Sequence, residues 1–296
     1  MLLGSLCTTD HNQMVCAVGD GKCNISDWIV IDLTEPQETL KKAIDYFKGF
    51  DDLAAIGISS FGPLELRTYS SQYGYIKESS RPNWQNINLL GTFKHHFNIP
   101  ISFTTDVNSR AYGEYISSIL NDDPILSLAY ITISDGVGVG IVNDGKFVGH
   151  MGSPEIGHII PQRNVNDQDF KGTCPYQGDC LEGLVSTKAI EARTHQRPQE
   201  ISMFNPLWDT VAFYIAQSVI QTTVFIRPQK VILGGSILNE IELGKIKEQF
   251  KKLFDGYLDV GDIDQYITLP SQDADKLSII GNLALAKQQF YSEDIR

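Results

Sequence analysis

Short apolar segments alternate with helical segments along the 296-residue chain, and this alternation constrains its fold more than any other feature. The segments with the length and side chains of strands are residues 14–19, 28–33, 53–59, 99–104, 127–133 and 230–233. The segments with helical spacing are residues 36–47, 207–226 and 279–289, and a further helical run follows residues 106–108 and extends through Leu120. We expect Thr34 to cap the first helix and Asn143-Asp144-Gly145 to form a hairpin turn. The alternation predicts an α/β fold with functional loops at strand ends.

A polar break at residues 121–124 (NDDP) divides this pattern into two halves. We therefore predict two α/β domains around a cleft. The first domain comprises residues 1–118, with a closing helix at residues 279–296 that packs back on it. The second, larger domain comprises residues 119–278 and contains a loop at residues 158–180 with metal-binding side chains.

Composition excludes several classes of protein. The chain has 24 Lys and Arg against 36 Asp and Glu, which gives a net charge of −12 and no basic surface to attract nucleic acid. No segment approaches the roughly 18 apolar residues of a membrane span, and no secretory signal is expected at the N-terminus. Five scattered cysteines do not suggest a disulfide framework. We expect a cytoplasmic protein without nucleic-acid or membrane partners.

Three polar or glycine-rich motifs are ambiguous when each is taken alone. Asp106 with Asn108 stands at a strand-to-helix junction, where an acid can serve catalysis but is more often a helix cap. The segment 134–140 (SDGVGVG) either lets the backbone approach a phosphate or forms a tight turn with positive φ. Gly234-Gly235 after a strand allows the same two interpretations.

His158, Cys174 and Cys180 offer three ligands of the kind that tetrahedral zinc prefers. The spacing of the two cysteines is not that of a standard zinc knuckle, so spacing alone leaves both a metal site and a metal-free loop open. Glu155 and Glu182 bracket this group. A loop organised by zinc can hold such carboxylates and the imidazole towards a polyol, because sugar hydroxyls require rigid acceptors.

The order of the motifs resembles the ROK (repressor, open reading frame, kinase) family, and most closely its bacterial fructokinases. The segments that carry the resemblance are residues 15–19 (VCAVG), 55–58 (AIGI), 61–63 (FGP), 105–108 (TDVN), 136–140 (GVGVG), 154–158 (PEIGH), 174–176 (CPY), 178–184 (GDCLEGL), 232–235 (ILGG) and 279–281 (IIG). They span almost the whole chain in the family's order.

The resemblance implies an actin-like ATPase fold of two ribonuclease-H-like domains that close on a hexose, with fructose favoured, and on Mg-ATP. Asp106 takes the position of the base that deprotonates the attacking sugar hydroxyl. The residues implied to hold or line the sugar are Gly62, Pro63, Asn108, Glu155, His158 and Glu182, with the loop at residues 79–83 on the other wall. The residues implied to contact the nucleotide are Ser134, Asp135, Gly136, Gly138, Thr187, Gly234 and Gly235.

The resemblance also implies a zinc ion on His158, Cys174 and Cys180. Gln177 stands where these fructokinases place their fourth ligand, a histidine, and an amide is a poor zinc ligand. Dimers are common in the family, so a homodimer is compatible with the resemblance. A transcriptional repressor is disfavoured, because no helix-turn-helix segment precedes the kinase core.

The chain departs from the family pattern mainly in its phosphate loops. Residues 6–14 (LCTTDHNQM) replace an Ala-Gly-Gly-Thr-Lys loop, so two glycines and a lysine are lost and Asp10 is gained. The second loop, usually Gly-Thr-Gly, reads Ser134-Asp135-Gly136. Acids at these positions repel phosphate unless a magnesium ion lies between them. Two hypotheses follow: a sugar kinase with atypical phosphate loops, or a pseudokinase that binds sugar or a protein partner without turnover.

Overall fold

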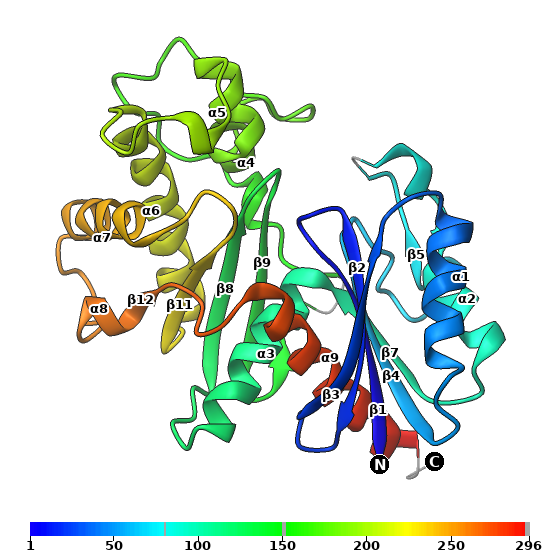
Figure 1. Cartoon of the computed structure of the whole chain (residues 1–296). Helices are drawn as coiled ribbons and strands as arrows, with labels where there is room; N and C mark the ends of the chain where they lie inside the picture. The colour runs from blue at the N-terminus through cyan, green and yellow to red at the C-terminus, as the bar shows by residue number, and fades with distance from the viewer. Residues whose placement is uncertain (80, 150–151, 294–296) are drawn as a thin grey trace. The chain divides into compact units, whose positions relative to one another are not determined.

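The computed structural model describes residues 1–79, 81–149 and 152–293, and the chain forms two compact units (Figure 1). Unit 1 comprises Met1–Pro124, Phe147–Ser153 and Gln272–Arg296. Unit 2 comprises Ile125–Lys146 and Pro154–Ser271. Each unit contains one five-stranded sheet, and each sheet has helices packed against it.

The sheet of unit 1 has the strand order β3-β2-β1-β4-β7. Its strands are β1 (Leu2–Thr8), β2 (Gln13–Asp20), β3 (Ile25–Asp32), β4 (Leu53–Ser60) and β7 (Ile101–Thr105). The strands β1, β2 and β3 form an antiparallel meander, whereas β4 and β7 run parallel to β1. Two short strands, β5 (Tyr75–Ile76) and β6 (Ile87–Asn88), form a separate ribbon.

Helices cover both faces of this sheet. They are α1 (Pro36–Phe47), α2 (Leu89–His96), α3 (Asp106–Leu120) and α9 (Ala274–Glu293), with a 3-10 turn at Pro82–Trp84. Alternate residues of β1 point to opposite faces, so Leu6 joins the core that contains Phe47 and Phe93, whereas Leu3 joins the core that contains Leu283. The two cores hold the sheet between helices.

The helices α3 and α9 cross at very short range. A Cβ atom on Gly113 of α3 would lie 2.1 Å from the carbonyl oxygen of Leu277, and one on Gly281 of α9 would lie 2.0 Å from that of Ser109. Only glycine at both positions permits this backbone contact, so the pair of glycines fixes the position of α9 on the helix that begins with Asp106.

The sheet of unit 2 repeats the arrangement, with the order β10-β9-β8-β11-β12. Its strands are β8 (Ser127–Ile133), β9 (Val137–Asn143), β10 (Lys146–Phe147), β11 (Lys230–Gly234) and β12 (Ile267–Thr268). β9 is antiparallel to β8, whereas β11 is parallel to β8 and β12 is parallel to β11. Its helices are α4 (Leu181–Val185), α5 (Thr187–Thr194), α6 (Leu207–Ile226), α7 (Glu240–Phe254) and α8 (Ile263–Tyr266), with 3-10 turns at Ile156–His158 and Pro198–Glu200.

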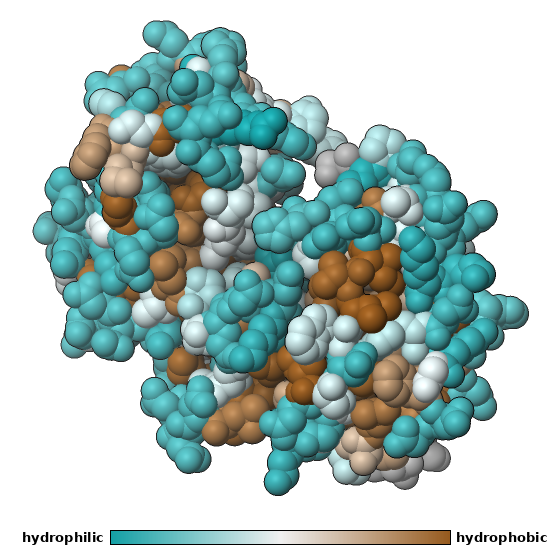
Figure 2. Space-filling model, viewed as in Figure 1, coloured by the Kyte–Doolittle hydropathy of each residue, from teal (hydrophilic) through white to brown (hydrophobic). Residues whose placement is uncertain are grey.

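The surface is mainly hydrophilic on the face seen in Figure 2, where apolar side chains gather in separate patches. In the part of the chain that the structure describes, no helix combines the length and the apolar character that a membrane crossing requires.

Several predicted elements are confirmed at their predicted bounds, namely the helices at 36–47 and 207–226 and the strand at 127–133, whereas the helix expected after residues 106–108 begins at Asp106 itself. The hairpin turn is confirmed as well, with positive φ at Asp144 and Gly145 between β9 and β10. The last helix begins at Ala274 rather than at residue 279, and the predicted domain boundary after residue 118 falls inside α3.

Two local features differ from expectation. The predicted cap Thr34 is wrong, because Glu35 occupies the N-cap position and the Thr34 backbone is engaged elsewhere: its N–H donates to Thr39 Oγ1 and its carbonyl accepts from Trp84 Nε1. Strand β1 was not predicted, because its sequence LLGSLCT includes the poor strand formers glycine and serine. Its pairing with two neighbours compensates for this weak preference.

Candidate functional site

Asp106 is the first residue of α3 and follows directly on the parallel strand β7. Thr105, not Asp106, caps the helix, because the Thr105 side chain accepts the N–H of Asn108 at 3.2 Å. The Asp106 Oδ1 atom accepts the N–H of Val107 at 2.8 Å. Burial raises the pKa of this partly buried carboxyl, while the positive charge of Arg110 lowers it. Thr105 is therefore the helix cap, and the Asp106 carboxylate is not committed to that role.

Asn108 presents a buried acceptor without a donor. Its side chain is 4% exposed, and its Nδ2 atom donates to Thr104 Oγ1 and Ser153 Oγ, each at 3.0 Å. No described residue donates to its Oδ1 atom. A buried amide oxygen in this state is costly unless a ligand supplies the hydrogen bond, and a hydroxyl group fits that requirement.

Gly62 and Pro63 follow strand β4 and are joined by a cis peptide bond. Ser60 of β4 pairs with Thr105 of β7 in the parallel register, so the loop after β4 begins beside Asp106. The N–H of Phe61 donates to Thr8 Oγ1 at 2.7 Å, which fixes this loop to the end of β1. The ends of three neighbouring strands thus meet at one edge of the unit 1 sheet, where ligands bind in open α/β sheets.

The loop predicted to form the other wall, residues 79–83, includes Ser80, which lies outside the described residues. Within this loop the Arg81 guanidinium stacks over the ring of Phe61, with its carbon 4.2 Å from the ring centroid. Its positive charge lowers the pKa of Asp106. The sequence analysis did not single out Arg81, although it was the basic residue in a predicted wall of the site.

Asp10 lies in the turn between β1 and β2, where the family's phosphate loop was expected. Its two carboxylate oxygens each lie 3.2 Å from a terminal nitrogen of Arg110, a residue of α3 that is 1% exposed. The acid is therefore paired with a buried cation. Sequence analysis missed Arg110, although its place four residues after Asp106 put both on one face of a helix.

In unit 2, the residues predicted to contact a nucleotide gather at the ends of β8 and β11 and at the start of α5. The N–H of Thr187 donates to the Ser134 carbonyl at 2.9 Å, and its hydroxyl donates to Asp135 Oδ1 at 2.7 Å. The N–H of Ser236 donates to Ser134 Oγ at 3.1 Å. These contacts bring three loops together at the carboxyl ends of two parallel strands.

The glycines of these loops have different roles. Gly235 has φ +112°, and a Cβ atom there would lie 2.1 Å from the Ile133 carbonyl oxygen, so the close approach of β11 to β8 requires glycine. Gly234 likewise packs on the ring of Tyr130. Residues 134–136 form the tight turn between β8 and β9, where Ile133 pairs with Val137, but neither Gly136 nor Gly138 has the expected positive φ, and Gly138 lies within β9.

Two carboxylates of unit 2 lie near the same strand end. Glu182 of α4 is half-buried, and its Oε2 atom accepts the N–H of Val137 at 2.9 Å. A Cβ atom on Gly136 would lie 2.8 Å from this oxygen, so glycine leaves the carboxylate accessible. Glu155 is exposed and immediately precedes the 3-10 turn that contains His158.

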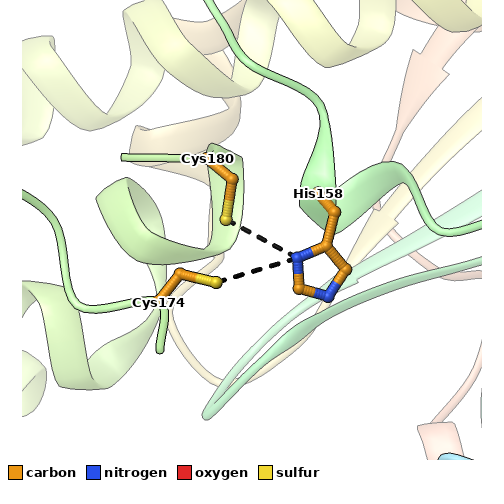
Figure 3. Close-up of side chains that lie close together, drawn as sticks. All are labelled: His158, Cys174 and Cys180. Carbon is orange, nitrogen blue, oxygen red and sulfur yellow. Dashed lines mark hydrogen bonds between the residues drawn. The ribbon is translucent and has the colours of Figure 1, made fainter. Parts of the chain in front are cut away.

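His158, Cys174 and Cys180 point towards one another, as Figure 3 shows. The His158 Nδ1 atom lies 3.8 Å from Cys174 Sγ and 3.7 Å from Cys180 Sγ, and all three ligand atoms lie within 4.8 Å of one another. Zn–S bonds of about 2.3 Å and Zn–N bonds of about 2.0 Å place the donors of a tetrahedral site roughly 3.5–3.8 Å apart. The three side chains therefore fit a zinc ion.

Gln177 completes the group with an oxygen atom. Its Oε1 atom lies 3.0 Å from His158 Nδ1 and 3.9 Å from Cys174 Sγ. Burial alone raises the pKa of the Cys174 thiol, but hydrogen bonds from the N–H groups of Gln177 and Tyr176 hold it below its usual value. Burial raises the pKa of the Cys180 thiol to about 11. One thiol of the pair is thus prepared to ionise, as a metal ligand must.

Comparisons with known proteins agree along the length of the chain. The ROK family model matches residues 11–289. A fructokinase from Streptococcus mutans is 42% identical over 280 residues, covering 93% of this chain and 94% of the relative. A fructokinase from Lactococcus lactis is 38% identical, covering 95% of this chain and 96% of the relative.

Solved structures show the same fold. The ROK hexokinase from Thermus thermophilus has a TM-score of 0.78 at 19% identity and covers 99% of this chain and 100% of its own. A ROK family glucokinase from Streptomyces griseus, in complex with glucose and AMPPNP, has a TM-score of 0.70 at 19% identity and covers 97% of this chain and 100% of its own.

Proposed function

Because the chain belongs to the ROK family, we propose that it is an ATP-dependent sugar kinase that phosphorylates a hexose, with fructose as the favoured substrate. The observation that carries the proposal is Asp106, a partly buried carboxylate at the end of a parallel strand that no helix-capping role occupies. The similarity to fructokinases over nearly the whole length of both chains favours fructose over other hexoses.

Asp106 is the general base of this proposal. Its carboxylate accepts the proton of the sugar hydroxyl while the hydroxyl oxygen forms a bond to the γ-phosphorus and ADP leaves, so the products are a sugar phosphate, ADP and one proton. Mg-ATP supplies the phosphoryl group, and its metal ion neutralises charge on the phosphates. The hydrogen bond from the Val107 N–H orients the carboxylate.

The sugar hydroxyls need acceptors and a shaped wall. We assign Asn108 Oδ1 to one hydroxyl, because it is a buried acceptor for which no described donor exists. Glu155, His158 and Glu182 of unit 2 are assigned to further hydroxyls, since carboxylates and imidazole are strong acceptors. Gly62 and Pro63 are assigned to the wall beside Asp106.

The nucleotide is assigned to the unit 2 residues Ser134, Asp135, Gly136, Gly138, Thr187, Gly234 and Gly235. Two observations support turnover despite the acidic phosphate loops. Arg110 offsets the charge of Asp10, and the Thr187 hydroxyl donates to Asp135. The alternative of a pseudokinase finds no support in the comparisons, whose full-length relatives are named fructokinases.

We further propose that His158, Cys174 and Cys180 hold a zinc ion that organises the loop at residues 158–180. The close approach of the three donor atoms supports it. Gln177 or a water molecule would complete the coordination. The cytoplasmic location and a homodimeric assembly remain predictions.

The test is ADP release with Mg-ATP and fructose at high enzyme concentration, with a sugar-free reaction for comparison. We expect sugar-dependent turnover that is lost in Asp106→Ala and retained in Asp45→Ala, a matched variant of an exposed acid on α1 whose partner is Lys41. Fructose should give a higher kcat/KM than glucose or mannose. Absence of turnover with all three sugars would overturn the kinase proposal, and an active Asp106→Ala would overturn the assigned base.

A further inference from the structure

We propose that Arg110 is a positioning residue for the reaction: it stabilises the negative charge of Asp106, and Asp10 limits how much of that stabilisation reaches the base. This inference rests on the proposed function for its catalytic consequence. The ion pair itself is a property of unit 1, and it can be tested without substrate.

The geometry brings the three charges together. Asp106 and Arg110 are one helical turn apart on α3 and therefore share a face of the helix. The Arg110 guanidinium is buried at 1% exposure and holds both oxygens of Asp10, each at 3.2 Å. This two-pronged contact joins the turn after β1 to the helix that begins with the base, and it fixes the guanidinium in one orientation.

Arg110 acts on more than one carboxyl. Its positive charge lowers the pKa of Asp106 and of Asp275 at the start of α9, whereas burial and Asp10 raise both. The charged and titratable groups around these sites come from every neighbouring element of unit 1: Cys7 in β1, Asp10 and His11 in the following turn, Arg81 before the 3-10 turn, Asp106 and Arg110 in α3, and Asp273 and Asp275 at α9. Arg110 is a shared counter-charge for this acidic group.

Stability does not account for such a pair. Burying the Arg110 guanidinium costs its hydration, and an ion pair whose other partner, Asp10, is partly exposed contributes little to offset that cost. A charge that keeps the neighbouring base ionised explains why an arginine occupies this position.

The proposal predicts opposite effects for the two partners of the ion pair. Arg110→Met removes the positive charge, so the acidic limb of the kcat/KM profile should move to higher pH, by about half a pH unit or more. Asp10→Asn removes the negative charge and leaves Arg110 in place, so the same limb should move to lower pH. The double variant should return the midpoint close to the wild-type value, and Arg110→Lys, which keeps the charge, should leave it in place.

A pair that is merely structural gives a different result. Its loss would lower kcat or thermal stability and leave the midpoint unchanged, or it would shift the midpoint in the same direction in both single variants. Either result overturns the proposal. Asp10 is 32% exposed in a turn, so Asp10→Asn should fold even if Arg110→Met does not, and an unmoved midpoint in Asp10→Asn alone also overturns it.

A second measurement separates this inference from the proposed function. The carboxyl carbon of Asp106 can be titrated by NMR in 13C-aspartate-labelled protein without sugar or nucleotide, with its signal assigned by its loss in Asp106→Asn. We expect the titration midpoint to rise in Arg110→Met and to fall in Asp10→Asn. If the wild type shows no sugar-dependent turnover, the kinase proposal fails, while these midpoints still decide whether Arg110 controls Asp106.

Discussion

The two units hold their acidic side chains in different ways. In unit 1, Asp10 is paired with the full charge of a buried arginine, and that arginine also acts on Asp106. In unit 2, Asp135 accepts a threonine hydroxyl and Glu182 accepts a backbone N–H, both neutral donors. Full charges in a partly buried site act over several ångströms, whereas a neutral hydrogen bond acts on the one atom it contacts.

The two units should therefore respond differently to substitution and to pH. Substitutions among the charges of unit 1 should change the pH dependence of the reaction, because they alter the ionisation of a base. Substitutions among the neutral contacts of unit 2 should change affinity and leave the pH dependence in place.

Asp106→Asn removes the proposed base and should reduce kcat by a factor of about 10²–10⁴. It should also raise the melting temperature at pH 7. Burial raises the pKa of Asp106, so its contribution to stability is full below the unfolded pKa and is lost as pH rises through the folded pKa. The asparagine side chain does not ionise, so the variant keeps this contribution to stability at pH 7. Calorimetry and ADP release check both effects, and a gain in stability that does not shrink as the pH falls would contradict this account.

Gln177→His gives unit 2 a centre with four nitrogen and sulfur ligands and should raise zinc affinity roughly 10–100-fold. Competition with a chromophoric chelator measures the affinity, and metal analysis gives the stoichiometry. Gln177→Asn keeps an amide and should bind zinc as weakly as the wild type or more weakly. Equal affinity in the histidine and asparagine variants would show that position 177 does not reach the metal.

Glu182→Gln weakens one proposed sugar acceptor in unit 2 and leaves the charges of unit 1 unchanged. We expect KM for fructose to rise about tenfold, since a hydrogen bond to a charged group contributes about 1.5 kcal/mol or more. The pH midpoint of kcat/KM should not move. Glu191→Gln, at an exposed position on α5, is the control. A shifted midpoint would break the contrast between the units.

Asp135→Asn keeps an acceptor for the Thr187 hydroxyl and removes a charge from the predicted nucleotide site. KM for ATP should fall about threefold at low ionic strength, and the gain should disappear at about 0.5 M salt, because exposed charges are screened. Initial rates at two salt concentrations test this. A higher KM would mean that Asp135 holds magnesium, so that unit 2 also depends on a full charge.

The α/β architecture and the actin-like fold could be predicted from the sequence and are confirmed by the similarity to ROK kinases. The motifs in their order carried that prediction, because strand ends and glycines at close approaches, such as Gly235, leave local signatures. The grouping of His158, Cys174 and Cys180 was also predictable, but from the family resemblance rather than from spacing, which left a metal-free loop open.

The ion pair of Asp10 and Arg110 could not be predicted in the same way. The two residues are far apart in the sequence, and only the packing of the β1–β2 turn against α3 brings them together. The sequence indicated an added negative charge at Asp10 and a cation one helical turn after Asp106, but it did not indicate that the two lie together. Strand β1 was missed for a related reason, because pairing with β2 and β4 stabilises it more than its own residues do.

The contact of α9 with α3 through Gly113 and Gly281 decides when unit 1 can be completed during translation. The strands of unit 1 leave the ribosome first, but one face of its sheet depends on Leu283 and other residues of α9 for its core. That helix follows all of unit 2 in the chain. A nascent chain therefore carries an uncovered apolar sheet while unit 2 is synthesised, and the unit whose strands emerge first is the last to finish folding.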